Sequence, residues 1–211
     1  MNNHENYIWP KAILDADFAL KMEKVKKINA IEEYIPQLVG HLYIHRYVYE
    51  NEILVPYRVK EQLQKLIGKG VASIVDAETL KQANPLNAHL YQQTINLLTG
   101  QNSKTKVNGK NWGETVSSAY AHISSIPFIL SDEIDLQQLL DSNINGVDRD
   151  ITVIRLRDFI LGMKEKNLSR KDAYAIWLFA KQDKKDRSKL ERAKVTFQED
   201  LWPLSKSAKK V

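Results

Sequence analysis

Hydrophobic and polar positions along the chain alternate between two kinds of segment. Short apolar or β-branched runs occur at 12–14, 40–45, 71–75, 127–131 and 150–156, and stretches with apolar residues at helical spacing separate them. Strands that alternate with helices in this way are typical of βαβ crossovers. We therefore predict an α/β protein, a three-layer α/β/α sandwich with a central, mainly parallel sheet.

The pattern changes near the C-terminal end. In "LSRKDAYAIWLFAKQ", Ser169 has the position of a helix N-cap, and four apolar residues between Ala173 and Ala180 share one helical face. A second helical stretch, "KKDRSKLERAKVTFQEDLW", is strongly charged. We predict a main domain over residues 1–167 and a basic helical extension over residues 168–211 that packs on it.

Composition narrows the class of protein. The 211 residues include no cysteine, which excludes disulfides and thiolate metal sites and favours a reducing cytosol. No apolar run approaches the roughly 20 residues that a membrane span requires, and the first residues lack the pattern of a secretory signal. We expect a cytoplasmic protein that has no membrane partner. A net charge of +5 is compatible with a polyanionic partner, although most lysines are simply solvated.

Acidic residues follow the predicted strands and open the predicted helices. They are Asp15 and Asp17 after the first strand, Glu50 and Glu52 after the second, Asp76 after the third, Glu114 after the polar loop 100–113, and Asp132 after "FILS". Parallel strands end at one edge of their sheet, where α/β proteins bind ligands. The sheet topology would decide which of these carboxylates meet.

Crowded carboxylates repel one another unless something positive lies among them, and no lysine or arginine lies at the strand ends that carry Asp15 and Asp17, Asp76 and Asp132. Oxygen-only ligands suit Mg²⁺ or Mn²⁺ better than zinc. A divalent ion in such a cluster can activate water to hydrolyse a phosphodiester. The alternative is structural, because Asp15 or Asp17 could cap the following helix and Glu114 could favour its helix dipole.

Four segments together resemble the PIN-domain superfamily of metal-dependent ribonucleases. They are "ILDADFAL", "HLYIHRYVYENEIL", "GETVSSAYAHISSIPFILSDEIDL" and "ITVIRLRDFILGM", which span roughly residues 10 to 165. The most specific part is "GE" followed eighteen residues later by "SDE". The resemblance implies an endoribonuclease that hydrolyses RNA with a metal-activated water, and Mg²⁺ or Mn²⁺ as the cofactor.

The resemblance also assigns the site residues. It implies Asp15 as the first-strand ligand, Glu114 as the acid of the Gly-Glu pair, Asp132 as the strand-end acid and Asp135 as the acid three residues later. The early-helix ligand is Glu50 or Glu52. The pair Glu52–Ile53 favours Glu52, whereas a register set on Val48 would put Asn51 there. The residues expected to carry catalysis are therefore Asp15, Glu52, Glu114 and Asp132.

Partners follow from the same resemblance. RNA is the expected substrate, with Lys104, Lys106 and Lys110 of the polar loop as contacts to its backbone. A homodimer and a protein regulator are left open, as is membership of a toxin–antitoxin pair. The alternative function is a catalytically inactive PIN-like domain that serves as a protein- or nucleic-acid-binding module. Such a module would tolerate a missing ligand, for example Asn51 in the place of the glutamate.

Overall fold

A computed structural model describes residues 7–100, 111–146, 150–182 and 186–204, and within them five strands form one sheet. The strands are β1 (Trp9–Leu14), β2 (Val39–His45), β3 (Ala72–Val75), β4 (Phe128–Leu130) and β5 (Thr152–Ile154). Their order is β3-β2-β1-β4-β5, and every neighbouring pair is parallel. The prediction of an α/β fold with a parallel central sheet is confirmed.

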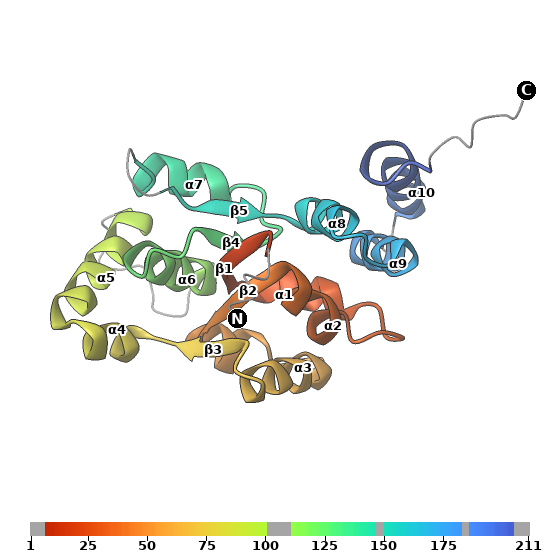
Figure 1. Cartoon of the computed structure of the whole chain (residues 1–211). Coiled ribbons are helices and arrows are strands. Elements are labelled where there is room, and N and C mark those ends of the chain that lie inside the picture. The colour runs from red at the N-terminus through yellow and green to blue at the C-terminus, as the bar shows by residue number, and fades with distance from the viewer. Residues whose placement is uncertain (1–6, 101–110, 147–149, 183–185, 205–211) are drawn as a thin grey trace, which may run out of the picture.

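Helices cover both faces of this sheet, as Figure 1 shows. One layer holds α1 (Ala16–Glu23), α2 (Ala30–Leu38), α3 (Tyr57–Gly68), α8 (Leu156–Glu165), α9 (Arg170–Lys181) and α10 (Arg187–Thr196). The other holds α4 (Ala77–Ala83), α5 (Pro85–Leu98), α6 (Trp112–Ile123) and α7 (Leu136–Asn143). Two π-helical turns, η1 (Val48–Glu52) and η2 (Phe197–Leu201), complete the elements.

The alternation of side chains along β1 separates the two cores. Ala12 and Leu14 belong to the cluster under α1 and α8, whereas Ile13 belongs to the cluster under α5 and α6. All three side chains are fully buried. A strand buried on both faces reads as a continuous apolar run, because successive residues point to opposite faces and both faces are covered.

Some predicted helices are divided in the structure. The helical stretch 18–39 forms α1 and α2, and the stretch after residue 76 forms α4 and α5. The second division follows from Asn84, whose side chain accepts a hydrogen bond from the N–H of Leu86 at 3.0 Å and so caps α5. Pro85 then begins the new helix, because a proline has no N–H to continue the previous one.

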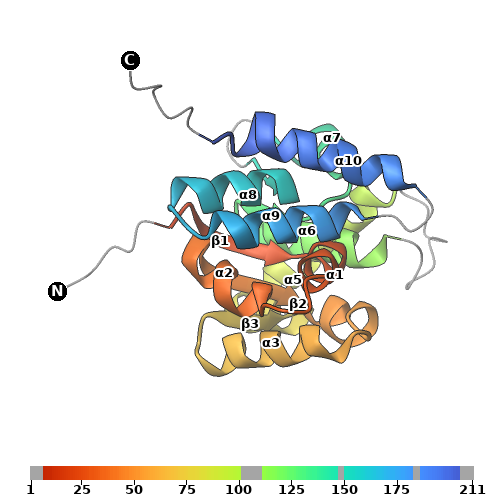
Figure 2. The same cartoon turned by 90° about the vertical axis from the view of Figure 1, so that its right-hand side faces the viewer.

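The C-terminal helices pack on the main domain. The hydroxyl of Ser169 accepts a hydrogen bond from the N–H of Asp172 at 3.2 Å, which confirms the predicted N-cap. The predicted apolar face of α9 is buried in the same cluster as Phe18 of α1 and Phe159 of α8. Trp177 Nε1 of α9 donates to the carbonyl of Ala193 of α10 at 2.8 Å and holds the two helices together. In Figure 2, α10 lies above α9. No described helix is long and apolar enough to cross a membrane.

Candidate metal centre

The strand order places a topological switch point between β1 and β4. The chain builds β2 and β3 on one side of β1 and then crosses to build β4 and β5 on the other side. Asp15 directly follows β1, and its N–H donates to the carbonyl of Leu130 at the end of β4, at 3.0 Å. Ser131 follows β4, and its hydroxyl donates to Asp15 Oδ2 at 3.1 Å. Both side chains are buried at the edge where ligands of such sheets bind.

Glu52 lies beside the start of α6. It ends the turn η1, and its Oε1 accepts a hydrogen bond from the N–H of Gly113 at 3.1 Å. A Cβ added to Gly113 would overlap this carboxylate, lying 2.5 Å from its Cδ. A side chain at position 113 would therefore require the carboxylate of Glu52, the far end of a flexible side chain, to move.

The electrostatics show that several carboxylates share this region. Burial and the charge of Glu52 raise the pKa of Asp15 to about 7. Burial, together with the charges of Asp15, Glu133 and Glu52, raises the pKa of Glu114 to about 7. Burial also raises the pKa of Glu52, against the favourable hydrogen bond from Gly113. We call Asp15, Glu52, Glu114 and Glu133 the acidic group.

No lysine or arginine among the described residues forms an ion pair with the acidic group. Burial first, and then the like charges around them, raise the pKa of two of its carboxyls, Asp15 and Glu114, to about 7. Asp15 does occupy the N-cap position of α1, but it makes no capping hydrogen bond to the N–H groups of the first turn beyond Ala16. Capping alone does not explain the crowding.

Asp132 is placed differently from the sequence-based expectation. Its Oδ2 accepts hydrogen bonds from Lys21 Nζ at 2.8 Å and Lys181 Nζ at 3.1 Å, and its Oδ1 accepts from the N–H of Leu156 at 3.3 Å. Burial opposes these contacts, but the two lysines hold the pKa of Asp132 below its usual value. Both of its oxygens are thus engaged by this chain. The two cations come from α1 and α9 and are distant from Asp132 in sequence, so the sequence pattern did not reveal them.

Glu133, the next residue, is the one that sequence analysis missed. Its charge contributes to the raised pKa of Glu114, and its N–H donates to Ser131 Oγ at 3.3 Å. No pattern in the sequence distinguished Glu133 from Asp132, because β4 ends at Leu130 and the alternation of strand side chains does not extend to the residues that follow it.

The structure does not bring the remaining predicted acids into the acidic group. Glu50 is exposed and forms an ion pair with Arg46, which also binds Asp76 beyond β3. Asp76 itself caps α4 through the N–H of Thr79. Asp135 is exposed at the start of α7. Lys104, Lys106 and Lys110 lie outside the described residues.

The carboxylates of the acidic group are suitable ligands for a hard cation, although they are not close enough together to surround one. Every donor is a carboxylate oxygen, which is the ligand type that Mg²⁺ and Mn²⁺ prefer. Over the described ranges, no three acidic or histidine side chains are close enough to form a ready metal site. The carboxylates are near enough to raise one another's pKa, and ion binding would require them to approach further.

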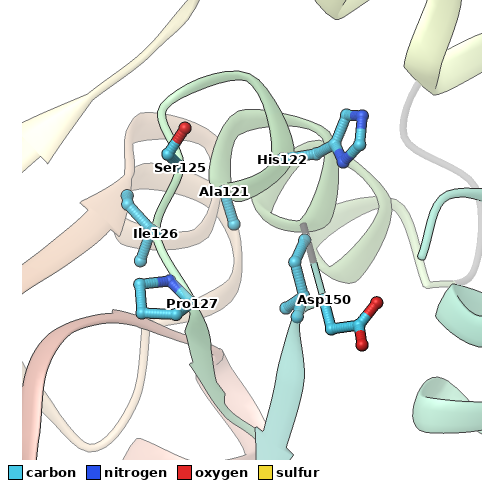
Figure 3. Close-up of a pocket in the computed structure, with 7 residues that line it drawn as sticks. Ala121, His122, Ser125, Ile126, Pro127 and Asp150 are labelled. Carbon is cyan, nitrogen blue, oxygen red and sulfur yellow. The ribbon is translucent and has the colours of Figure 1, made fainter. Parts of the chain in front are cut away.

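A separate cavity of about 230 Å³ lies away from the acidic group. Figure 3 shows Asp150 across from Ile126 and Pro127. The residues that line the cavity are Ala121, His122, Ser125, Ile126, Pro127, Asp150 and Ile151. Pro127 and Ile151 precede β4 and β5, so the cavity lies at the amino ends of these strands, the opposite edge from Asp15. It contains none of the predicted site residues.

Comparisons with protein-family models, with curated proteins and with solved structures return no match for this chain.

Proposed function

We propose that this chain is a metal-dependent nuclease of the PIN-like type, which hydrolyses RNA phosphodiester bonds in the cytoplasm with Mg²⁺ or Mn²⁺. The observation that carries the proposal is the acidic group at the switch point of the parallel sheet. Four carboxylates from four separate segments of the chain lie near enough there to affect the pKa of Asp15 or Glu114, and no described lysine or arginine forms an ion pair with them. Such an arrangement is costly to folding, and a bound cation would compensate it.

The acidic group would hold the ion through Asp15, Glu52, Glu114 and Glu133. When bound, the ion would supply Lewis-acid chemistry, activating water and balancing the charge that develops on the phosphate. The chain's own contribution is to orient the ligands. The hydroxyl of Ser131 fixes Asp15 Oδ2, and the N–H of Gly113 fixes Glu52 Oε1. We place Asp132 outside this ligand set, because its oxygens already bind Lys21, Lys181 and Leu156.

The direct test is calorimetric titration of Mn²⁺ into chelator-treated protein, compared with cleavage of a labelled RNA. Wild type should bind the ion and cleave, and Asp15→Asn should lose both. Glu50→Gln is a matched control, because it also removes one acidic charge but belongs to the exposed ion pair with Arg46. Equal Mn²⁺ affinity in Asp15→Asn and Glu50→Gln would show that the acidic group is not a metal centre.

The same titration distinguishes the two adjacent acids. Glu133→Gln should weaken Mn²⁺ binding, whereas Asp132→Asn should leave it within about threefold of wild type, a difference below 1 kcal/mol. The reverse result would return Asp132 to the ligand set.

A second candidate function is a non-catalytic binding module with the same fold. The observation that favours it is that no three described acidic or histidine side chains are spaced to hold an ion. This candidate predicts that Mn²⁺ produces no binding heat in wild type and that no RNA is cleaved at any Mn²⁺ concentration.

A further inference from the structure

Two lysines converge on one carboxylate oxygen beside the acidic group. Lys21 of α1 and Lys181 of α9 both donate to Asp132 Oδ2, at 2.8 Å and 3.1 Å. Lys21 also binds Asp17, the residue one helical turn earlier, whose charge adds to the raised pKa of Asp15 and Glu114. The paired lysines therefore lie at the border of the acidic group.

The two lysines are not equally neutralised. Lys21 has two carboxylate partners, Asp17 and Asp132, whereas Lys181 shares only Asp132 among the described residues. The ammonium of Lys181 also lies over the ring of Trp177, 5.1 Å from its centroid, which orients a cation without removing its charge. The side chain of Lys181 is 36% exposed, so a ligand in solution can reach it.

The position of Lys181 is set by the packing of α9. Ala180 and Trp177 are buried in the core, and Lys24, the C-cap residue of α1, donates to the carbonyl of Ala180 at 3.3 Å. The last turn of α9 is thus attached to α1 on the side where Asp132 lies. The C-terminal helices contribute a side chain to the border of the site in addition to covering the sheet.

We propose that Lys181, supported by Lys21, binds a backbone phosphate of the nucleic acid next to the phosphate that is cleaved. Asp132 would be a positioning residue that holds both ammonium groups at this place before the ligand arrives. An ammonium group has three N–H donors, and among the described contacts Lys181 uses one of them for Asp132, so a phosphate oxygen can accept another. This inference rests on the proposed function and names the residue through which that site would contact its substrate.

The test measures binding of a fluorescein-labelled oligouridylate by anisotropy in a Glu114→Gln background, in which hydrolysis is blocked. Titrations run from about 50 to 200 mM KCl, with Lys181→Met, Lys181→Arg and Lys171→Met. Lys171 is an exposed lysine in the first turn of the same helix, so its variant removes the same charge at the far end of α9. Thermal melts confirm that each variant is folded.

Lys181→Met should weaken binding about three- to tenfold and reduce the slope of log affinity against log salt by about 0.7, the value for one phosphate contact on a single strand. Lys181→Arg should restore most of the affinity, and Lys171→Met should match the background. If Lys181→Met and Lys171→Met behave alike, the phosphate contact is refuted.

Metal-dependent cleavage by the protein with Glu114 intact is measured in parallel, which separates the two proposals. If the protein cleaves RNA but Lys181→Met does not change the affinity for oligouridylate, this inference alone is overturned. If Lys181→Met weakens oligouridylate binding but no Mn²⁺-dependent cleavage occurs, the phosphate contact is supported and the nuclease proposal is overturned. Absence of any oligouridylate binding together with absence of cleavage overturns both.

Discussion

The hydroxyl of Ser131 donates a hydrogen bond to Asp15 Oδ2 at 3.1 Å, joining the ends of β4 and β1. Both side chains are buried, with exposed fractions of 0% and 3%. The bond favours the charged form of Asp15 and opposes the burial and the charge of Glu52 that raise its pKa. The bond exists because the strand order places β4 beside β1, and it affects the protonation state of Asp15, a proposed metal ligand.

Removing this hydroxyl should weaken metal binding. In Ser131→Ala, Asp15 loses a hydrogen bond to its charged form, a contact of about 1.5 kcal/mol or more, so Mn²⁺ affinity at neutral pH should fall about tenfold. Calorimetric titration measures the change. Ser73→Ala is the control, because Ser73 bonds His41 on the β2–β3 side of the sheet. Unchanged affinity in Ser131→Ala would mean that the bond does not prepare Asp15 for an ion.

Gly113→Ala should move the carboxylate of Glu52 out of its present place. The new Cβ would overlap that carboxylate, and Glu52 can avoid it only by turning away. We expect Mn²⁺ affinity and cleavage to fall together while α6 still forms. Gly68→Ala is a matched control in α3, where nothing lies within 4 Å of the added Cβ. That change should leave the site intact and stabilise the protein by up to about 1 kcal/mol. Parallel loss of affinity in both variants would contradict the role given to Gly113.

The stability of the chelator-treated protein should decrease as pH rises from about 4 to 7. A carboxyl whose pKa is raised in the folded state binds its proton more tightly there than in the unfolded chain. The folded state thus gains stability at low pH and loses it as pH rises through the pKa of Asp15, about 7. Urea unfolding at pH 5 and pH 8 should show this fall.

Asp15→Asn should remove roughly 2–4 kcal/mol of this pH dependence. Glu50→Gln should retain it, because Glu50 lies in an exposed ion pair. Added Mn²⁺ should reduce the loss of stability at pH 8 in wild type but not in Asp15→Asn. His45 contributes in the opposite direction over this pH range in both proteins, so the test is the difference between them. The same change in stability between pH 5 and pH 8 in chelator-treated wild type and Asp15→Asn would contradict the prediction.

A second acid-sensitive group lies away from the site. His45 Nδ1 accepts the N–H of Tyr47 at 3.1 Å, so its Nε2 carries the proton and donates to Tyr91 Oη at 3.0 Å. Burial lowers the pKa of His45 to about 4. The folded state therefore keeps the neutral ring, and stability is lost as pH falls from about 6.5 towards 4. The two-dimensional NMR signal of His45 should titrate near pH 4, and a midpoint near 6.5 would contradict this.

The fold class was predictable because the patterns that indicate strands and helices lie within short stretches of sequence. Continuous apolar runs marked the strands, and helical spacing marked the helices between them. The breaks within helices were harder, since Asn84 and Pro85 act through a cap and a missing N–H inside a stretch that otherwise has helical spacing. The sequence pattern alone did not establish the strand order that makes β1 the neighbour of β4.

The site was predictable only in part, because its geometry depends on long-range contacts. Asp15 and Glu114 were expected from their places at a strand end and a helix start, and the structure places them in one group with Glu52. Whether Asp132 or Glu133 belongs to the acidic group depends on the directions in which their side chains point after β4 ends. Lys181 could not be expected, because only the packing of α9 on α1 brings it to Asp132.

The ion pair between Asp132 and Lys181 also has a consequence for synthesis of the chain. The two residues are 49 positions apart, and every member of the acidic group precedes or directly follows Asp132. All four carboxylates of the acidic group are therefore synthesised, and leave the ribosome, before α9 does. If both proposals hold, the nascent chain contains all its ion-binding carboxylates before it contains the lysine that contacts a phosphate.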